Sequence, residues 1–155
     1  MRAWEVIGRI AYIVLLPAIF VYAEVSKPRT RMLIIVDEEV LVVKNWLGAG
    51  NWSLPGGGAH KHETPLKAAI REVNEELGID LSTSEIKELG QHVSMESKLL
   101  KSKYYLFSVT LKQKPQLKLQ QVEIMGSKWL NTSEVDQNTR LAATVKDSVR
   151  VWLKS

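Results

Sequence analysis

The feature that most constrains this chain is a run of glycines directly ahead of a strongly marked helix. Pro55-Gly56-Gly57-Gly58 cannot sustain a regular element, because three consecutive glycines leave the backbone unrestrained. Over residues 65–77, apolar side chains recur at intervals of three and four, which predicts an amphipathic helix. Thr64 stands at the N-cap, Pro65 at the first helical position and Gly78 just past the end. The sequence therefore predicts a loop leading into a helix with two defined ends.

The segments around this helix predict a sheet. Two β-branched runs, 32–36 and 40–44, are divided by Asp37-Glu38-Glu39 and indicate a hairpin. Three further strands and a closing amphipathic helix are expected at residues 89–94, 103–111, 124–130 and 139–153. Strands interspersed with two helices predict an α/β fold with a mixed β-sheet covered on both faces. A length of 155 residues suits one such domain with a single core.

Charge and cysteine content exclude several classes of function. The chain has 21 Lys and Arg against 17 Asp and Glu, a formal net charge of +4. This mild excess suits a phosphate-bearing ligand or an anionic membrane surface and is too small to predict a stable nucleic-acid partner. Because cysteine is absent, disulfides, zinc-thiolate sites and cysteine nucleophiles are excluded.

The N-terminal segment, residues 1–25, differs from the rest. Every residue from Ile10 to Ala23 is apolar, Tyr or Pro, and Val6 to Val25 makes roughly the 20 positions needed to cross a bilayer. The polar stretch 26–31, which contains a proline, then marks the boundary with a second unit, residues 26–155.

Three interpretations of residues 6–25 stay open: a membrane anchor, a cleaved signal peptide, and an apolar helix packed on the domain or across a homodimer. Arg9 and Pro17 oppose a simple span, while Lys27, Arg29 and Arg31 directly after it would keep the catalytic domain cytoplasmic. The anchor with a cytoplasmic domain is the favoured expectation.

Acidic residues carry the chemistry of the predicted helix. Glu72, Glu75 and Glu76 stand at i, i+3 and i+4, so their carboxylates share one face and repel one another. A divalent cation would relieve that repulsion, and hard oxygen ligands suit Mg²⁺, with Mn²⁺ as a substitute. Arg71 lies four residues before Glu75 and eight after Glu63, so it can pair with either acid.

The spacing of these residues resembles the Nudix box. Gly57 is followed after five residues by Glu63, and after seven more by Arg71-Glu72-Val73-Asn74-Glu75-Glu76-Leu77-Gly78-Ile79. The signature is Gly-x5-Glu-x7-Arg-Glu-U-x-Glu-Glu-x-Gly-U, where U is a bulky apolar residue. The resemblance implies a Nudix-type α/β/α sandwich over roughly Arg31 to Ser155.

The resemblance also implies roles for individual residues. Metal binding or activation of water would fall to Glu72, Glu75 and Glu76, oriented by Arg71, with the Gly57 carbonyl as a further metal contact. Glu63 would be a supporting ligand or a partner of Arg71. The backbone of Gly56, Gly57 and Gly58 can approach a metal or a substrate phosphate closely.

Two positions outside the defining pattern are further candidates. His62 stands where many members have glycine, and is either a solvated loop residue or a contact for substrate phosphate. Many members also draw an acid from a later loop, a few residues before a Trp. Glu123, six residues before Trp129, matches that description, and Glu96 is the alternative.

The function implied is Mg²⁺-dependent hydrolysis of a diphosphate linkage in a nucleoside diphosphate derivative or a nucleoside triphosphate, with Glu72 or Glu123 taking the proton of the water. Two alternatives stay open. One is a lipid or isoprenoid diphosphate substrate at a membrane, which the apolar N-terminus suggests. The other is a non-catalytic module that binds a nucleotide as a sensor.

Overall fold

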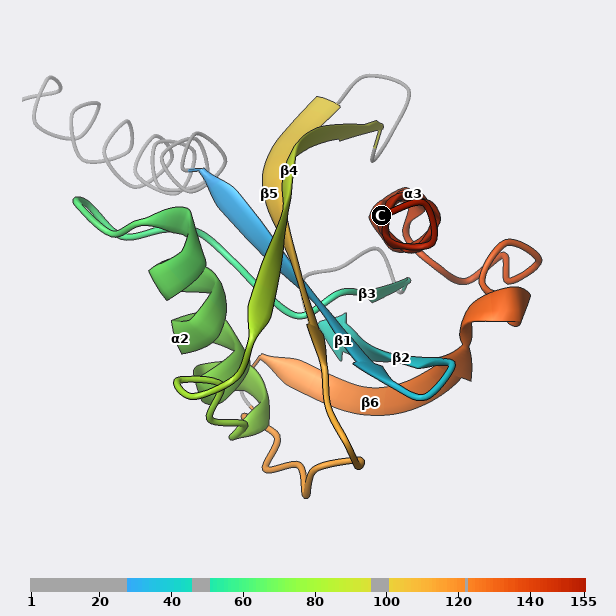
Figure 1. Ribbon diagram of the computed structural model, residues 1–155, viewed down its shortest axis with the longest axis horizontal. Coiled ribbons are helices and arrows are strands. Elements are labelled where there is room, and N and C mark those ends of the chain that lie inside the picture. Colours follow the sequence, from blue (N-terminus) through green and yellow to red (C-terminus); the bar gives the residue numbers. More distant parts are fainter. Residues whose placement is uncertain (1–27, 46–50, 96–100, 122) are drawn as a thin grey trace, which may run out of the picture.

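The computed structural model describes residues 28–45, 51–95, 101–121 and 123–155 (Figure 1). The expectations for residues 1–25, and the candidate Glu96, lie outside these ranges. Within the described ranges, no helix is both long and apolar enough to span a bilayer.

Six strands form one mixed sheet. The elements, in chain order, are β1 (Arg29–Val36), β2 (Glu39–Asn45), β3 (Trp52–Ser53), α2 (Pro65–Leu77), β4 (Ile86–Met95), β5 (Lys101–Thr110), β6 (Ile124–Asn131), the 3-10 helix η1 (Thr132–Glu134) and α3 (Ala143–Trp152). The strand order is β3-β2-β1-β5-β4, and β6 pairs with β2. β1 and β5 run parallel, whereas the other pairs are antiparallel. The predicted mixed sheet is confirmed.

The sheet is covered on both faces, with α2 on one side and α3 on the other (Figure 1). Alternate residues of each strand point to opposite faces, so the sheet supplies two cores. The first core joins sheet and α2 residues: Met32, Ile34, Leu41, Val43, Phe107, Val109, Ala69, Val73 and Leu77. The second joins sheet and α3 residues: Leu33, Ile35, Val40, Val42, Leu106, Val145 and Val149. This is the expected α/β/α sandwich.

The helix that carries the acids begins and ends where its sequence predicts. The Thr64 hydroxyl accepts a hydrogen bond from the Lys67 N–H at 3.3 Å. At the other end Gly78 has φ 69°, and its N–H donates to the Asn74 carbonyl at 2.8 Å. A left-handed residue of this kind ends a helix with little strain only if it lacks a side chain. The two caps therefore define the ends of α2.

The closing helix is shorter than predicted, and one short strand was not predicted. Trp52 donates its N–H to the Arg140 carbonyl and accepts from the Ala142 N–H, at 2.9 and 2.8 Å. Residues 139–140 therefore form a turn, Leu141 pairs with Trp52 of β3, and α3 begins only at Ala143. The expectation of a helix from residue 139 was wrong because this long-range pairing overrides the local amphipathic pattern.

Candidate active site

Arg71 is the centre of a hydrogen-bond network on the first half of α2. Its Nε and Nη2 donate to the two carboxylate oxygens of Glu63 at 2.9 and 3.0 Å. Its Nη1 donates to Glu72 at 3.0 Å and to Glu75 at 2.9 Å. Nη2 also donates to the Gly58 carbonyl at 3.0 Å. One guanidinium therefore joins the glycine loop, the first acid of the box and two acids of the helix.

Electrostatics keep the Arg71–Glu63 pair ionised. Hydrogen bonds from Arg71 are the main cause that lowers the pKa of Glu63 from 4.5 to about 2, and the His60 backbone N–H, donating at 2.8 Å, adds to them. The carboxylate of Glu63 in turn raises the pKa of Arg71 above its usual value. Both groups are therefore charged at neutral pH, and the bidentate pair sets the plane of the guanidinium.

Glu76 is the buried acid of the site. It is only 3 % exposed, and its Oε2 accepts a hydrogen bond from the Gly56 N–H at 3.0 Å. Burial is the main cause that raises its pKa from 4.5 to about 7; the charges of Glu72 and Glu123 act in the same direction, and the Gly56 N–H and the charge of Arg31 act in the opposite direction. A carboxyl with this pKa titrates near neutrality and would gain from a cation placed beside it.

Glu72 is intermediate in burial between Glu76, which is buried, and Glu75, which is exposed. Burial raises its pKa against the hydrogen bond from Arg71, and the charges of Glu75 and Glu123 raise it further. Glu123 is thus close enough to perturb both Glu72 and Glu76, although it follows them by more than forty residues. The charge of Glu123 therefore acts on Glu72 and Glu76, while Glu75 is 51 % exposed and contacts Arg71.

The glycine loop passes close to both β1 and α2. Gly56 has φ 129°, and a Cβ there would lie 2.4 Å from the Thr30 carbonyl oxygen. A Cβ on Gly57 would lie 2.6 Å from the carboxylate of Glu72. The Gly57 carbonyl accepts from the N–H and the hydroxyl of Thr30, at 2.8 and 3.3 Å. Only glycine fits at either position without displacing a neighbour.

One residue of the site was missed by the sequence interpretation. Arg31, on β1, donates its Nη1 to the Gly56 carbonyl at 2.6 Å and to the Thr30 carbonyl at 3.3 Å. Arg31 thus binds the carbonyl of Gly56, the residue whose N–H binds Glu76. No local pattern marks Arg31, because it stands 25 residues before its partner and only the packing of β1 beside the loop brings the two together.

His62 is exposed, and its backbone has φ 67°. This left-handed conformation favours glycine and is uncommon for other residues. Glycine, which the resemblance to the Nudix box leads us to expect at this position, would adopt this conformation without strain. His62 lies in the turn directly before Glu63, ahead of α2.

The donor chemistry of these acids fits a hard divalent cation, because carboxylate oxygens are what Mg²⁺ takes from proteins. Across the described residues, no three acidic or histidine side chains form a ready-made metal cage. Several of their oxygens are hydrogen-bonded to Arg71 and Gly56. Mg²⁺ usually keeps waters and substrate oxygens among its ligands, so a complete protein cage is not what it requires.

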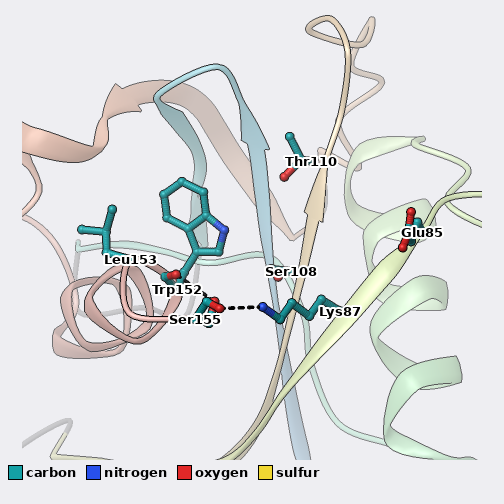
Figure 2. A pocket seen from close by; sticks show the side chains of 7 residues that line it. All are labelled: Glu85, Lys87, Ser108, Thr110, Trp152, Leu153 and Ser155. Carbon is teal, nitrogen blue, oxygen red and sulfur yellow. Dashed lines mark hydrogen bonds between the residues drawn. The ribbon is translucent and has the colours of Figure 1, made fainter.

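A separate open pocket of about 500 Å³ lies between β4, β5 and the end of α3 (Figure 2). Its lining consists of Glu85, Lys87, Ser108, Thr110, Trp152, Leu153 and Ser155. The Lys87 Nζ donates to the Ser155 carbonyl at 3.1 Å across its mouth. The candidate site residues described above do not line this pocket. The acids of α2, whose carboxylates can bind a cation, therefore remain the candidate active site.

Comparison with known proteins establishes the family and agrees with the fold. The sequence model of the NUDIX domain matches residues 26–152, so the chain belongs to the Nudix domain family.

Particular relatives share shorter stretches. The chain is 38 % identical over 50 residues to an 8-oxo-dGTP diphosphatase of Proteus vulgaris, a match that covers 32 % of this chain and 44 % of the relative. It is 32 % identical over 69 residues to an RNA pyrophosphohydrolase of Hydrogenovibrio crunogenus, covering 44 % and 41 %. Both matches span less than half the length of those relatives.

A solved structure shows the same fold over nearly the whole domain. The Ap4A hydrolase of C. elegans, solved as a binary complex, superposes with a TM-score of 0.68 at 20 % identity, covering 83 % of this chain and 96 % of that one. At this identity the likeness establishes the fold alone.

Proposed function

We propose that this chain hydrolyses a diphosphate linkage in a nucleoside diphosphate derivative or a nucleoside triphosphate, with Mg²⁺ as cofactor. The observation that carries the proposal is the set of box acids held beside the glycine loop: the Gly56 N–H binds Glu76, and Arg71 binds both Glu72 and Glu75. Glu123 is close enough for its charge to raise the pKa values of Glu72 and Glu76. Three mutually repelling carboxylates, one of them nearly buried, are costly to bring together unless a cation acts among them.

The residues that would hold the cation are Glu72, Glu75 and Glu76. When bound, Mg²⁺ would neutralise the diphosphate and lower the pKa of an attacking water. The Gly57 carbonyl stays a proposed metal contact; its longer hydrogen bond, from the Thr30 hydroxyl at 3.3 Å, is the one that it would exchange. Mn²⁺ would substitute, because it takes the same oxygen ligands.

The other residues would position and transfer protons. Arg71 would keep Glu72 and Glu75 oriented, and Glu63 would keep Arg71 oriented, as their mutual hydrogen bonds favour. Either Glu72 or Glu123 would accept the proton of the attacking water. Burial and the charges of Glu75 and Glu123 raise the pKa of Glu72, which would make Glu72 a stronger base than an isolated carboxylate.

The glycine loop would receive the phosphates. Gly56, Gly57 and Gly58 present backbone rather than side chains toward the acids, which allows a phosphate to approach closely. His62 would stand at the mouth of the loop as a phosphate contact. Positioning and electrostatic stabilisation would then supply most of the lowering of the barrier.

A nucleotide substrate is favoured because the relatives are named for 8-oxo-dGTP, RNA and Ap4A. The lipid diphosphate alternative rests on the composition of residues 6–25, and the sensor alternative is opposed by the complete set of box acids.

We propose that residues 6–25 attach a cytoplasmic domain to the membrane. Recovery of the intact chain in a detergent-free soluble fraction would exclude that attachment.

A substrate panel in the presence of Mg²⁺ tests the proposed function. It includes nucleoside triphosphates, ADP-ribose, dinucleoside polyphosphates, capped RNA and prenyl diphosphates, with release of phosphate or diphosphate monitored. Turnover of a nucleotide that stops when EDTA is added is the expected result. Turnover of prenyl diphosphates alone would favour the lipid alternative, and tight nucleotide binding without turnover would favour the sensor.

A further inference from the structure

The connection between β5 and β6 crosses the C-terminal end of α2. Within it, the Lys118 N–H donates to the Leu77 carbonyl at 2.8 Å, and the Gln120 N–H donates to the Glu76 carbonyl at 3.0 Å. The last carbonyls of an α-helix have no partner within the helix. Residues 117–120, which we call the strap, supply two of the missing partners.

The strap is anchored on its other side by the core. Leu117 and Leu119 pack partly buried against the core beneath α2, and they alternate with the residues whose N–H groups bind the helix. This alternation is that of extended chain, with side chains on one side and helix contacts between them. A Cβ on Gly78 would lie 2.9 Å from the Lys118 Cβ, so the helix end and the strap are in direct contact.

Gln120 is the residue where the strap meets the acids. While its N–H binds the Glu76 carbonyl, its own carbonyl accepts the N–H groups of Glu123 at 3.0 Å and Ile124 at 2.9 Å. Ile124 is buried and begins β6. The backbone of a single residue therefore links the helical acid Glu76 to the loop acid Glu123, over a path of only two hydrogen bonds.

We infer that Gln120 is a positioning residue, whose backbone holds the Glu123 carboxylate beside those of Glu72 and Glu76. The inference rests on the proposed function and deepens it. Three carboxylates repel one another, so a loop acid without restraint would move outward into solvent. The strap resists that movement through its helix contacts and its partly buried leucines, and the side chain of Gln120, which is exposed, takes no part.

A matched pair of variants separates the backbone from the side chain. Gln120→Pro removes the N–H that binds Glu76, whereas Gln120→Ala keeps it. We expect Gln120→Pro to lower kcat at least about tenfold with KM within about twofold, since a small misplacement of a catalytic group is costly. Gln120→Ala should match the wild type. Equal kcat in the wild type and Gln120→Pro would overturn the inference.

A double-mutant cycle with Glu123→Gln distinguishes positioning from a general structural effect. If the strap acts through Glu123, the loss of kcat caused by Gln120→Pro should largely disappear in the Glu123→Gln background. An equal loss in both backgrounds would show that the strap acts by another route. Leu119→Ala, which loosens the anchor without changing the backbone, gives the same comparison if Gln120→Pro fails to fold.

Amide hydrogen exchange gives a readout that does not depend on activity. In the wild type, the amides of Lys118, Gln120 and Glu123 should be protected, and those of Glu123 and Ile124 should exchange faster in Gln120→Pro. Fast exchange of the Gln120 amide in the wild type would contradict the hydrogen bond between the strap and the Glu76 carbonyl. If the wild type turns over no substrate, the proposed function fails while the exchange data still test the geometry.

Discussion

Arg71 and Glu63 form a two-pronged pair, with Nε and Nη2 of the guanidinium 2.9 and 3.0 Å from the two carboxylate oxygens. This pair leaves Nη1 free to bind Glu72 and Glu75 together. Through Arg71, Glu63 in the loop before α2 is therefore linked to Glu72 and Glu75 on the helix.

Arg71→Lys tests the importance of the fork. Lysine keeps the positive charge but cannot make the planar, two-pronged contact, so Glu72 should lose its fixed orientation. We expect kcat to fall about a hundredfold. Arg150→Lys is the control, because Arg150 also pairs with two acids, Asp136 and Asp147, but is 54 % exposed and far along the chain. Similar kcat values for the two variants would argue against an orienting role of Arg71.

Gly57→Ala tests the close approach of the loop to Glu72. The added Cβ would lie 2.6 Å from the carboxylate, which must move, whereas the backbone of Gly57 is not left-handed and tolerates alanine. We therefore expect kcat to fall at least about tenfold while the midpoint of thermal unfolding changes little. Gly126→Ala, whose nearest neighbour would be 3.8 Å away, should change neither quantity. Undiminished kcat in Gly57→Ala would contradict this account of the loop.

Glu76→Gln tests the cost of burying a charge. In the folded protein the pKa of Glu76 is raised to about 7 from 4.5, so between these pH values the folded state binds more protons than the unfolded state. The free energy of unfolding should then fall as pH rises through this window, by up to about 3 kcal/mol. The lowered pKa of Glu63 acts below this window and does not interfere.

Without divalent metal, Glu76→Gln should therefore be more stable than the wild type at pH 8, and the difference should shrink toward pH 5. Denaturant unfolding in EDTA at both pH values measures it. A constant difference between the two proteins across this range would show that Glu76 does not carry the buried charge.

Glu123→Gln and Glu96→Gln decide which loop acid takes part in catalysis. Glu123 perturbs the pKa values of both Glu72 and Glu76, so its neutralisation should lower kcat more than that of Glu96. Steady-state kinetics of the two variants at saturating Mg²⁺ makes the comparison. A slower Glu96→Gln enzyme would transfer the role to Glu96.

The sequence predicts those parts of the site whose signals are local. Thr64 and Gly78 define the ends of α2, and the spacing from Glu63 to Arg71 defines the clamp. The hairpin of β1 and β2 follows from β-branched runs on either side of a polar turn, whose first residue, Asp37, adopts φ 53°. Each of these depends on a few consecutive residues.

The contacts that the sequence does not predict depend on the register of distant strands. Arg31 reaches Gly56 because β1 lies beside the glycine loop, and Trp52 binds Arg140 and Ala142 because β3 lies beside the chain before α3. The strap at Gln120 has no pattern of its own, since its hydrogen bonds come from backbone groups. Such contacts become visible only when the sheet is assembled.

The central claim is that the acids of α2 bind the metal that drives hydrolysis, and Glu75→Gln and Glu76→Gln test it most directly. Each variant removes one anionic oxygen donor while preserving shape, and Glu85→Gln, at the edge of the separate pocket, is the control. With any substrate that the wild type hydrolyses at saturating Mg²⁺, we predict a loss of kcat of at least about a hundredfold for both variants and none for the control. Values of kcat near that of the wild type in both variants would contradict the claim.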